Sequence, residues 1–177
     1  MLAFSHGDST AFDELFLRYR QPIFAFFRRR TLDLPRAEEL AQETFIALLR
    51  ASSRYQPRAL FRTYLYAIAF KILHADRRKS TFRSFFGSHA DIHNVGAAGS
   101  NNDEILWIRQ ALARLDATDR EILLLREFEQ LSYLEIADLL KLPLNTVRSR
   151  LFRARLALRH HLEPCAAATP VPLGELS

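Results

Sequence analysis

Apolar residues recur at helical spacing through two long stretches of this chain, residues 11–79 and 103–162. Neither stretch has the alternating β-branched pattern of a strand, and the 177 residues include only five glycines. Between them lies the sequence GSHADIHNVGAAGSNN, which has no sustained period and is typical of a linker. We therefore predict an all-α protein with two small helical domains. The predicted boundaries are 1–79 for the first domain, 80–102 for a flexible linker, 103–162 for the second domain and 163–177 for a flexible tail.

The charge balance favours an anionic partner. The formal net charge is +5, which suits nucleic acid or a membrane surface. Of the 25 basic residues only Lys71, Lys79 and Lys141 are lysine, and the others are arginine. Arginine makes bidentate contacts with phosphate and guanine. A GC-rich genome would also raise the arginine content, so composition alone does not decide in favour of DNA.

Several function classes find no support in the sequence. The single cysteine, Cys165, cannot form an internal disulfide, and no Cys/His set has zinc spacing. His89 and His93 lie four residues apart but in the predicted linker, without further ligands. There is no phosphate-binding glycine loop, no HExxH motif and no plausible serine or cysteine triad. We therefore expect no enzyme activity, no metal and no other cofactor.

The sequence also lacks membrane and export signals. No stretch approaches the roughly 18 apolar residues that a membrane span needs. The first ten residues lack the charged and apolar blocks of a signal peptide. We expect a cytoplasmic protein without membrane insertion.

A helix-turn-helix is predicted near the C-terminus. Residues 131–159 have the sequence LSYLEIADLLKLPLNTVRSRLFRARLALR. Here YLEIADLL predicts a short helix, KLP a turn, and Asn145 an N-cap for a second helix from Thr146 onward. The second helix should bury one apolar stripe against the first, which contributes Ile136, Ala137 and Leu140. That stripe consists of Val147, Leu151, Ala154 and Leu158.

The second helix of this motif is strongly basic. No Asp or Glu occurs between Asp138 and Glu163, so ion pairs within the helix cannot neutralise its arginines. These arginines are Arg148, Arg150, Arg153, Arg155 and Arg159. We expect DNA phosphate to supply the missing counter-charge, with the helix in a major groove. A basic face that is merely solvated is the alternative.

The faces of this helix predict different contacts. Thr146, Ser149 and Arg153 point away from the apolar stripe and should meet base edges or the groove floor. Arg148, Arg155 and Arg159 line one flank, and Arg150 lines the other. The flanks should meet phosphate.

Two helices of the first domain present candidate surfaces. In RAEELAQETFIALLRA, residues 36–51, one face carries the core stripe Ala37, Leu40, Ala41, Thr44 and Leu48. The opposite face carries Glu39, Glu43, Ile46 and Arg50, with Gln42 beside them. An isoleucine among charges indicates either a partner surface or a lone exposed apolar residue.

The next segment, residues 54–79, combines aromatic and basic residues. We predict a core stripe of Phe61, Leu65, Ile68 and Ile72. Facing away from it should be Tyr66, Phe70, His74 and Arg77, flanked by Lys71 and Arg78. Aromatic rings among cations are what single-stranded DNA binding needs. The alternative is that another helix buries the rings.

The motifs resemble one known family. LREFEQLSYLEIADLLKLPLNTVRSRLFRARLAL resembles region four of extracytoplasmic-function (ECF) sigma factors of the sigma-70 family, whose pattern is close to LSYEEIA...PxGTVRSRxxRAR. Asn145 stands where the family often has glycine. RAEELAQETF resembles the AEDLxQExF core of region two, and residues 54–79 resemble the FRxWLYxIA segment. The likeness runs from about residue 11 to residue 162.

The resemblance implies an alternative sigma factor that binds core RNA polymerase, at its β′ clamp and β flap, and directs promoter-specific initiation. It implies minus-35 contacts by Thr146, Arg148, Ser149, Arg150, Phe152, Arg153 and Arg155. For the minus-10 element it implies Arg54, Tyr55, Tyr66, Phe70, Lys71, Arg77 and Arg78, with an extruded base held in the loop of residues 52–60. For the polymerase it implies Glu39, Gln42, Glu43 and Ile46.

The resemblance also implies an anti-sigma factor as a further partner. The runner-up is a stand-alone helix-turn-helix repressor or activator that binds its operator without polymerase. A weaker alternative is a protein-binding adaptor that does not touch DNA, against which the arginine face argues.

Overall fold

The protein consists of two compact helical units, Met1–His93 and Asn94–Ser177. The computed structural model describes residues 1–5, 8–31, 33–57, 59–86 and 100–163. Every regular element within these ranges is a helix, which confirms the all-α prediction. Helices continue into both ends of the predicted linker, while residues 87–99 and the predicted tail 164–177 lie outside the described residues.

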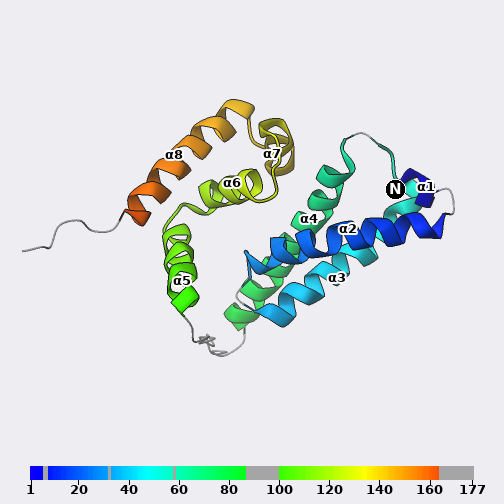
Figure 1. The fold of residues 1–177 in the computed structure, drawn as a ribbon, viewed down its shortest axis with the longest axis horizontal. Coiled ribbons are helices and arrows are strands. Elements are labelled where there is room, and N and C mark those ends of the chain that lie inside the picture. The colour runs from blue at the N-terminus through cyan, green and yellow to red at the C-terminus, as the bar shows by residue number, and fades with distance from the viewer. Residues whose placement is uncertain (6–7, 32, 58, 87–99, 164–177) are drawn as a thin grey trace, which may run out of the picture. The chain divides into compact units, whose positions relative to one another are not determined.

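The first unit is built on three long helices. These are α2 (Ser9–Arg28), α3 (Leu34–Ala51) and α4 (Phe61–Phe86), and they pack against one another (Figure 1). A short helix α1 (Leu2–Ser5) precedes them, and the 3₁₀-helix η1 (Ser52–Arg54) follows α3. Asp8 caps α2, its Oδ1 accepting from the backbone N–H groups of Thr10 at 3.0 Å and Ala11 at 3.3 Å.

The core stripe predicted for α3 is confirmed. Ala37, Leu40, Ala41, Thr44 and Leu48 are all buried. Thr44 is the polar member of this stripe, and its hydroxyl donates to the Leu40 carbonyl at 2.9 Å. The hydroxyl therefore keeps a hydrogen bond inside the core, which offsets the cost of burying it.

The buried face of α4 differs from the prediction. The fully buried residues are Leu65, Ala69 and Leu73, whereas Phe61, Ile68 and Ile72 are only half-buried. Tyr66 and Phe70, expected on an outer DNA-binding face, are 4% and 9% exposed. Their assignment to a stacking surface is wrong, and the alternative in which another helix buries the rings is correct.

The reason is that α4 contacts both α2 and α3, so its buried arc is wider than a single stripe. The Tyr66 ring lies against Phe26 of α2, with centroids 5.7 Å apart. Phe70 packs against His74, which is exposed, at 4.3 Å. Lys71, Arg77 and Arg78 are exposed, as predicted.

The second unit is organised around its last helix. The helices are α5 (Ser100–Ala113), α6 (Ala117–Glu127), α7 (Tyr133–Leu140) and α8 (Leu144–Leu162), and α8 contacts the other three. Asp116 caps α6. A capping box begins α7, in which the Glu135 N–H donates to the Ser132 hydroxyl at 3.2 Å and the Ser132 N–H donates to the Glu135 carboxylate at 2.7 Å.

The helix-turn-helix forms as predicted, apart from one cap. Helix α7 spans the predicted YLEIADLL, and Lys141 then adopts a left-handed conformation with φ 56°. Helix α8 begins at Leu144 with Pro143 as its N-cap, so the predicted Asn145 cap is wrong. Pro143 has φ −60° and ψ 142°, and its carbonyl accepts from the Val147 N–H at 3.1 Å. Pro143, whose ring fixes φ, therefore takes the N-cap position ahead of Asn145.

The apolar stripe of α8 is confirmed at its centre. Val147, Leu151 and Ala154 are 0–2% exposed, and Leu158 is half-buried. Ile136 of α7 is fully buried, while Ala137 and Leu140 are half-buried. The opposite face of α8 therefore points to solvent.

The burial of Phe70 generates a stability prediction. Phe70→Ala should lower the free energy of unfolding of the first unit by about 3 kcal/mol, because removal of the buried ring leaves a cavity. Lys71→Ala, at the exposed neighbouring position, should change it by no more than about 0.5 kcal/mol. Denaturant unfolding of the full chain, followed by circular dichroism, measures both.

The single tryptophan gives an internal control, because Trp107 lies in the second unit. The transition followed by its fluorescence should be the same in both variants. Equal stabilities of Phe70→Ala and Lys71→Ala would show that the Phe70 ring is not part of the core.

Candidate nucleic-acid and partner interfaces

The outer face of α8 carries most of the residues predicted to contact duplex DNA. Arg148, Ser149 and Arg153 are exposed, and Thr146 is half-buried in the first turn. The Ser149 hydroxyl donates to the Thr146 carbonyl at 3.1 Å. Ser149 and Arg153, which the helical periodicity placed away from the buried stripe, are thus exposed, and so is Arg148 on the flank.

Three of the five arginines on α8 have acid partners, which corrects the expectation that only phosphate could neutralise them. Arg150 Nη1 lies 2.8 Å from Asp119 and 3.2 Å from Asp116. Arg155 Nη2 lies 2.6 Å from Glu127. The remaining pair joins Arg159 to Glu163 at 3.2 Å. Except for Glu163, these acids come from the region of α6, which packs on α8.

The pairing also appears in the electrostatics. The pKa of Arg150 is raised above its ordinary value, mainly by its hydrogen bond to Asp119. The pKa of Arg155 is raised mainly by its hydrogen bond to Glu127. The pKa of Asp116 is lowered, first by the backbone N–H of Asp119 and to a smaller extent by Arg150. These ion pairs stabilise the charged forms of the two arginines.

Two arginines differ from the other three. In the part of the chain that the structure describes, Arg148 and Arg153 have no acid partner, and both side chains are exposed. Each guanidinium can therefore donate its fork of N–H groups to a phosphate or to a guanine edge. The unneutralised positive charge of α8 is concentrated on this outer face.

Exposed apolar side chains occur on α8, near these arginines in the sequence, and on α7. Phe152 is 64% exposed and Leu156, one turn later, is 52% exposed. Leu134 of α7 is 66% exposed. Apolar groups on a groove-facing surface can contact thymine methyl groups.

The face of α3 predicted to meet the polymerase points to solvent. Glu39, Gln42, Glu43 and Ile46 are all exposed. Ile46 is 46% exposed, and Leu49, which the sequence analysis did not single out, is 39% exposed. The i,i+3 spacing of Ile46 and Leu49 is the signal that could have identified the pair.

An ion-pair bridge holds the first turn of α3. Arg36 donates from Nε and Nη2 to Asp76 Oδ1 of α4, at 3.0 and 2.5 Å, and from Nη1 to Glu39 at 2.5 Å. These contacts raise the pKa of Arg36, and the hydrogen bond to Asp76 is the largest cause. This bridge could not be predicted from helical periodicity, because Arg36 and Asp76 are 40 residues apart.

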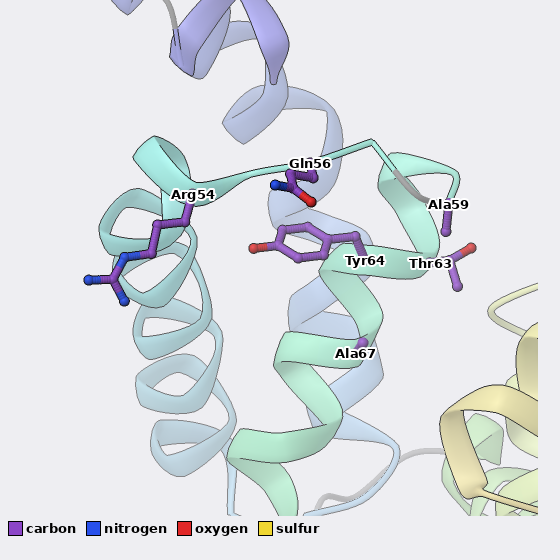
Figure 2. A pocket seen from close by; sticks show the side chains of 6 residues that line it. All are labelled: Arg54, Gln56, Ala59, Thr63, Tyr64 and Ala67. Carbon is purple, nitrogen blue, oxygen red and sulfur yellow. The ribbon is translucent and has the colours of Figure 1, made fainter.

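The loop of residues 52–60 borders a pocket of about 490 Å³. Figure 2 shows Tyr64 and Ala67 projecting from α4 beneath the segment that carries Gln56, with Arg54 beyond. The remaining lining residues are Ala59 and Thr63. Of these residues only Arg54 was predicted as a site residue. Gln56, Thr63 and Tyr64 were missed, although the loop itself was singled out.

Aromatic rings line the same loop. Tyr55 follows η1, and its ring lies edge-on to Tyr64 with centroids 5.0 Å apart. Partial burial raises the pKa of the Tyr55 phenol, and the neighbouring Tyr64 adds to the rise. Both tyrosines are half-buried, so the rings near the surface lie beside the pocket and not at Tyr66 and Phe70.

Among the described residues, no cluster of three or more His, Cys, Asp or Glu side chains could hold a metal ion. His89 and His93 lie outside those residues. Within the same ranges no helix has the length and apolar character needed to cross a membrane.

Comparison with protein families gives two matches, in the same order as the two units. Residues 15–83 match the family model described as Sigma-70 region 2. Residues 105–158 match the model described as Sigma-70, region 4.

Several curated relatives resemble nearly the whole chain. The RNA polymerase sigma-H factor of Pseudomonas aeruginosa is 35% identical over 172 residues, covering 89% of this chain and 89% of the relative. The RNA polymerase sigma factor YlaC of Bacillus subtilis is 31% identical, covering 89% and 94%. The ECF RNA polymerase sigma-E factor of Salmonella typhimurium is 32% identical, covering 89% and 90%.

Solved structures show a similar fold. The sigma factor RpoE of Bartonella quintana, in complex with the anti-sigma factor NepR, gives a TM-score of 0.75 at 21% identity, covering 86% of this chain and 96% of that chain. CnrH, in complex with the cytosolic domain of CnrY, gives 0.69 at 23% identity, covering 90% and 93%.

The family matches and the relatives agree with the helix-turn-helix and with the motifs of the first unit. The chain belongs to the sigma-70 family, as an ECF-type alternative sigma factor that binds core RNA polymerase and directs promoter-specific transcription initiation.

Proposed function

We propose a division of this activity between the two units. Helix α3 docks the first unit on core polymerase, the loop and pocket beside α4 hold the opened minus-10 strand, and α8 reads the minus-35 duplex. The single observation that carries the proposal is the outer surface of α8, where Arg148 and Arg153 are exposed and have no acid partner among the described residues. Function in the cytoplasm, where core polymerase works, follows from this proposal.

For the minus-35 element, Ser149 and Arg153 are proposed to meet base edges because they lie opposite the buried stripe. Arg148 and the exposed ring of Phe152 lie near them and face the same groove. Thr146, Arg150 and Arg155 are proposed as contacts at the edges of this surface. Arg150 and Arg155 must then exchange an acid partner for a phosphate.

For the minus-10 element, the pocket of about 490 Å³ is proposed to take an extruded base. Its volume lies within the range of about 300–1,000 Å³ that is usual for small-molecule pockets. The Tyr64 ring offers a stacking face, and Gln56 and Thr63 offer polar groups to the base edge. The residues proposed to contact the opened strand or its phosphates are Arg54, Tyr55, Lys71, Arg77 and Arg78. Tyr66 and Phe70 are not part of this proposal, because they are buried.

For the polymerase, the exposed face of α3 is proposed to bind the β′ clamp. Its residues are Glu39, Gln42, Glu43 and Ile46. The exposed apolar pair Ile46 and Leu49 supports this assignment, since exposed apolar groups rimmed by polar residues suit a protein partner.

The second unit offers a separate apolar groove of about 610 Å³ between α5, α6 and α8. Its apolar lining consists of Ile108, Leu112, Leu123, Phe128, Leu158 and Leu162. This groove is proposed as the site for the β flap. An anti-sigma factor is proposed as a further partner, because the similar RpoE structure is a complex with one.

The first prediction tests the function itself. Added to bacterial core polymerase, the full chain should direct specific run-off transcripts from a promoter upstream of its own operon, whereas core alone should not. A stand-alone repressor or activator would instead footprint that DNA without polymerase. Absence of a promoter-dependent transcript on native templates, together with a footprint by the chain alone, would favour the runner-up.

A second prediction concerns the docking face of α3. Ile46→Glu should weaken binding to core polymerase about 10-fold, because it places a charge in a contact that must exclude water. Leu17→Glu is the matched control, since Leu17 is a 62% exposed leucine on α2 that is outside the proposed face. Affinity for core is measured by fluorescence titration. If both variants bind core like the wild type, this face of α3 is only solvated surface.

A third prediction concerns the pocket. Tyr64→Ala in the assembled holoenzyme should reduce the equilibrium constant for opening about 5- to 150-fold, because stacking is worth about 1–3 kcal/mol per base. Tyr64→Phe keeps the ring and should retain opening. Permanganate reactivity of unpaired thymines reports the open complex. Equal defects in the two variants would show that the hydroxyl, and not stacking, matters at this position.

A further inference from the structure

Glu127, the last residue of α6, is paired with one arginine of the DNA-facing helix. Arg155 donates from Nε at 3.0 Å and from Nη2 at 2.6 Å, both to Glu127 Oε1. This Nε/Nη2 edge of the guanidinium is one of the forks with which arginine binds a phosphate. Glu127 and a DNA phosphate therefore compete for the same donors.

The pair is accessible to solvent and to DNA. The side chain of Arg155 is 50% exposed and that of Glu127 is 45% exposed. Solvent-exposed ion pairs are weak, since water and salt screen them. Arg155 can thus leave Glu127 when a phosphate is presented in a suitable position.

The corresponding arginine on the other flank is held more firmly. Arg150 is 31% exposed and contacts two acids, of which Asp119 is only 16% exposed. Asp116, the second acid, also caps α6. Arg150 therefore ties α8 to α6, whereas the Arg155 pair is the one that can exchange.

The two modes of DNA binding differ in what they offer Arg155. Non-specific binding depends on phosphate contacts, with the helix in many registers. In the cognate complex, base contacts fix the register and place one phosphate at each flank. In either mode Arg155 must leave Glu127 before it contacts a phosphate, so the acid lowers the sequence-independent, phosphate part of the affinity.

We propose that Glu127 limits DNA affinity, because it occupies the phosphate-binding edge of Arg155 and competes with the DNA backbone for it. The inference rests on the proposed placement of α8 on duplex DNA. It gives a role in DNA binding to Glu127, a residue of α6 that does not itself contact DNA. The charge pattern of the unit supports it, because Glu127 leaves Arg148 and Arg153 as the arginines without acid partners among the described residues of α8.

The experiment measures binding of the full chain to a short duplex of random sequence by fluorescence anisotropy over a range of salt concentrations. Glu127→Gln should raise the affinity about 3-fold at low salt and steepen the slope of log affinity against log salt by about 0.9, because one more phosphate contact forms. Both effects should vanish when Glu127→Gln is combined with Arg155→Gln.

Asp138→Asn is the matched control. Asp138 is an exposed acid of the same unit and has no ion-pair partner among the described residues, so its removal changes the net charge equally. If Asp138→Asn reproduces the effect of Glu127→Gln, only net charge matters and the inference is overturned. An unchanged salt slope in Glu127→Gln overturns it as well.

Arg148→Ala separates this inference from the proposed function, because Arg148 lies on a flank predicted to meet phosphate and its loss should lower affinity for DNA of any sequence. A loss of affinity in Arg148→Ala with no effect of Glu127→Gln overturns the role of Glu127 and leaves α8 on the DNA. If neither variant changes binding, α8 is not the DNA-binding surface, and both proposals fail.

Discussion

Burial of the apolar stripe of α8 is the constraint on which the second unit depends. Val147, Leu151 and Ala154 are withdrawn from water, and α5, α6 and α7 all contact this one helix. Removing such side chains costs a few kcal/mol each where they are large, so α8 cannot rotate about its axis without losing the core. Its rotation in turn determines which arginines face outward. The position of the exposed arginines is therefore a consequence of packing on the other side of the same helix.

Much of this arrangement could be predicted from the sequence, because it depends on local periodicity. The bounds of α7, the stripe of α8 and the buried face of α3 all follow from 3.6-residue spacing. The ion pairs of Arg150 and Arg155 could not be predicted in this way, since their partners are 28–34 residues away. A search within one helix finds only partners three or four residues distant. The absence of acids between Asp138 and Glu163 was real, but it did not show how the fold neutralises the arginines.

In the first unit, too, local periodicity does not predict how the helices contact one another. Periodicity predicts one buried stripe for α4, but two neighbouring helices bury a wider arc, which includes Tyr66 and Phe70. Amphipathic aromatic residues suit both a core and a DNA surface, so residue type alone does not choose between these environments. The bridge from Arg36 to Asp76 and Glu39 likewise depends on how α3 and α4 meet. It connects the exposed face of α3 with the helix that borders the pocket.

Helix α4 is unbroken, and this fixes the distance between the pocket at its start and the basic residues further along it. Phe61–Phe86 is a single helix, with Tyr64 of the pocket near its start and Arg78 well along it. At about 1.5 Å per residue, the axial separation of these two residues is roughly 21 Å. That length corresponds to about six base steps of duplex DNA at about 3.4 Å each. Because the helix is continuous, it fixes the distance between Tyr64 and Arg78. An insertion or deletion between these two residues would change that distance and would also disturb the packing of α4 on α2 and α3.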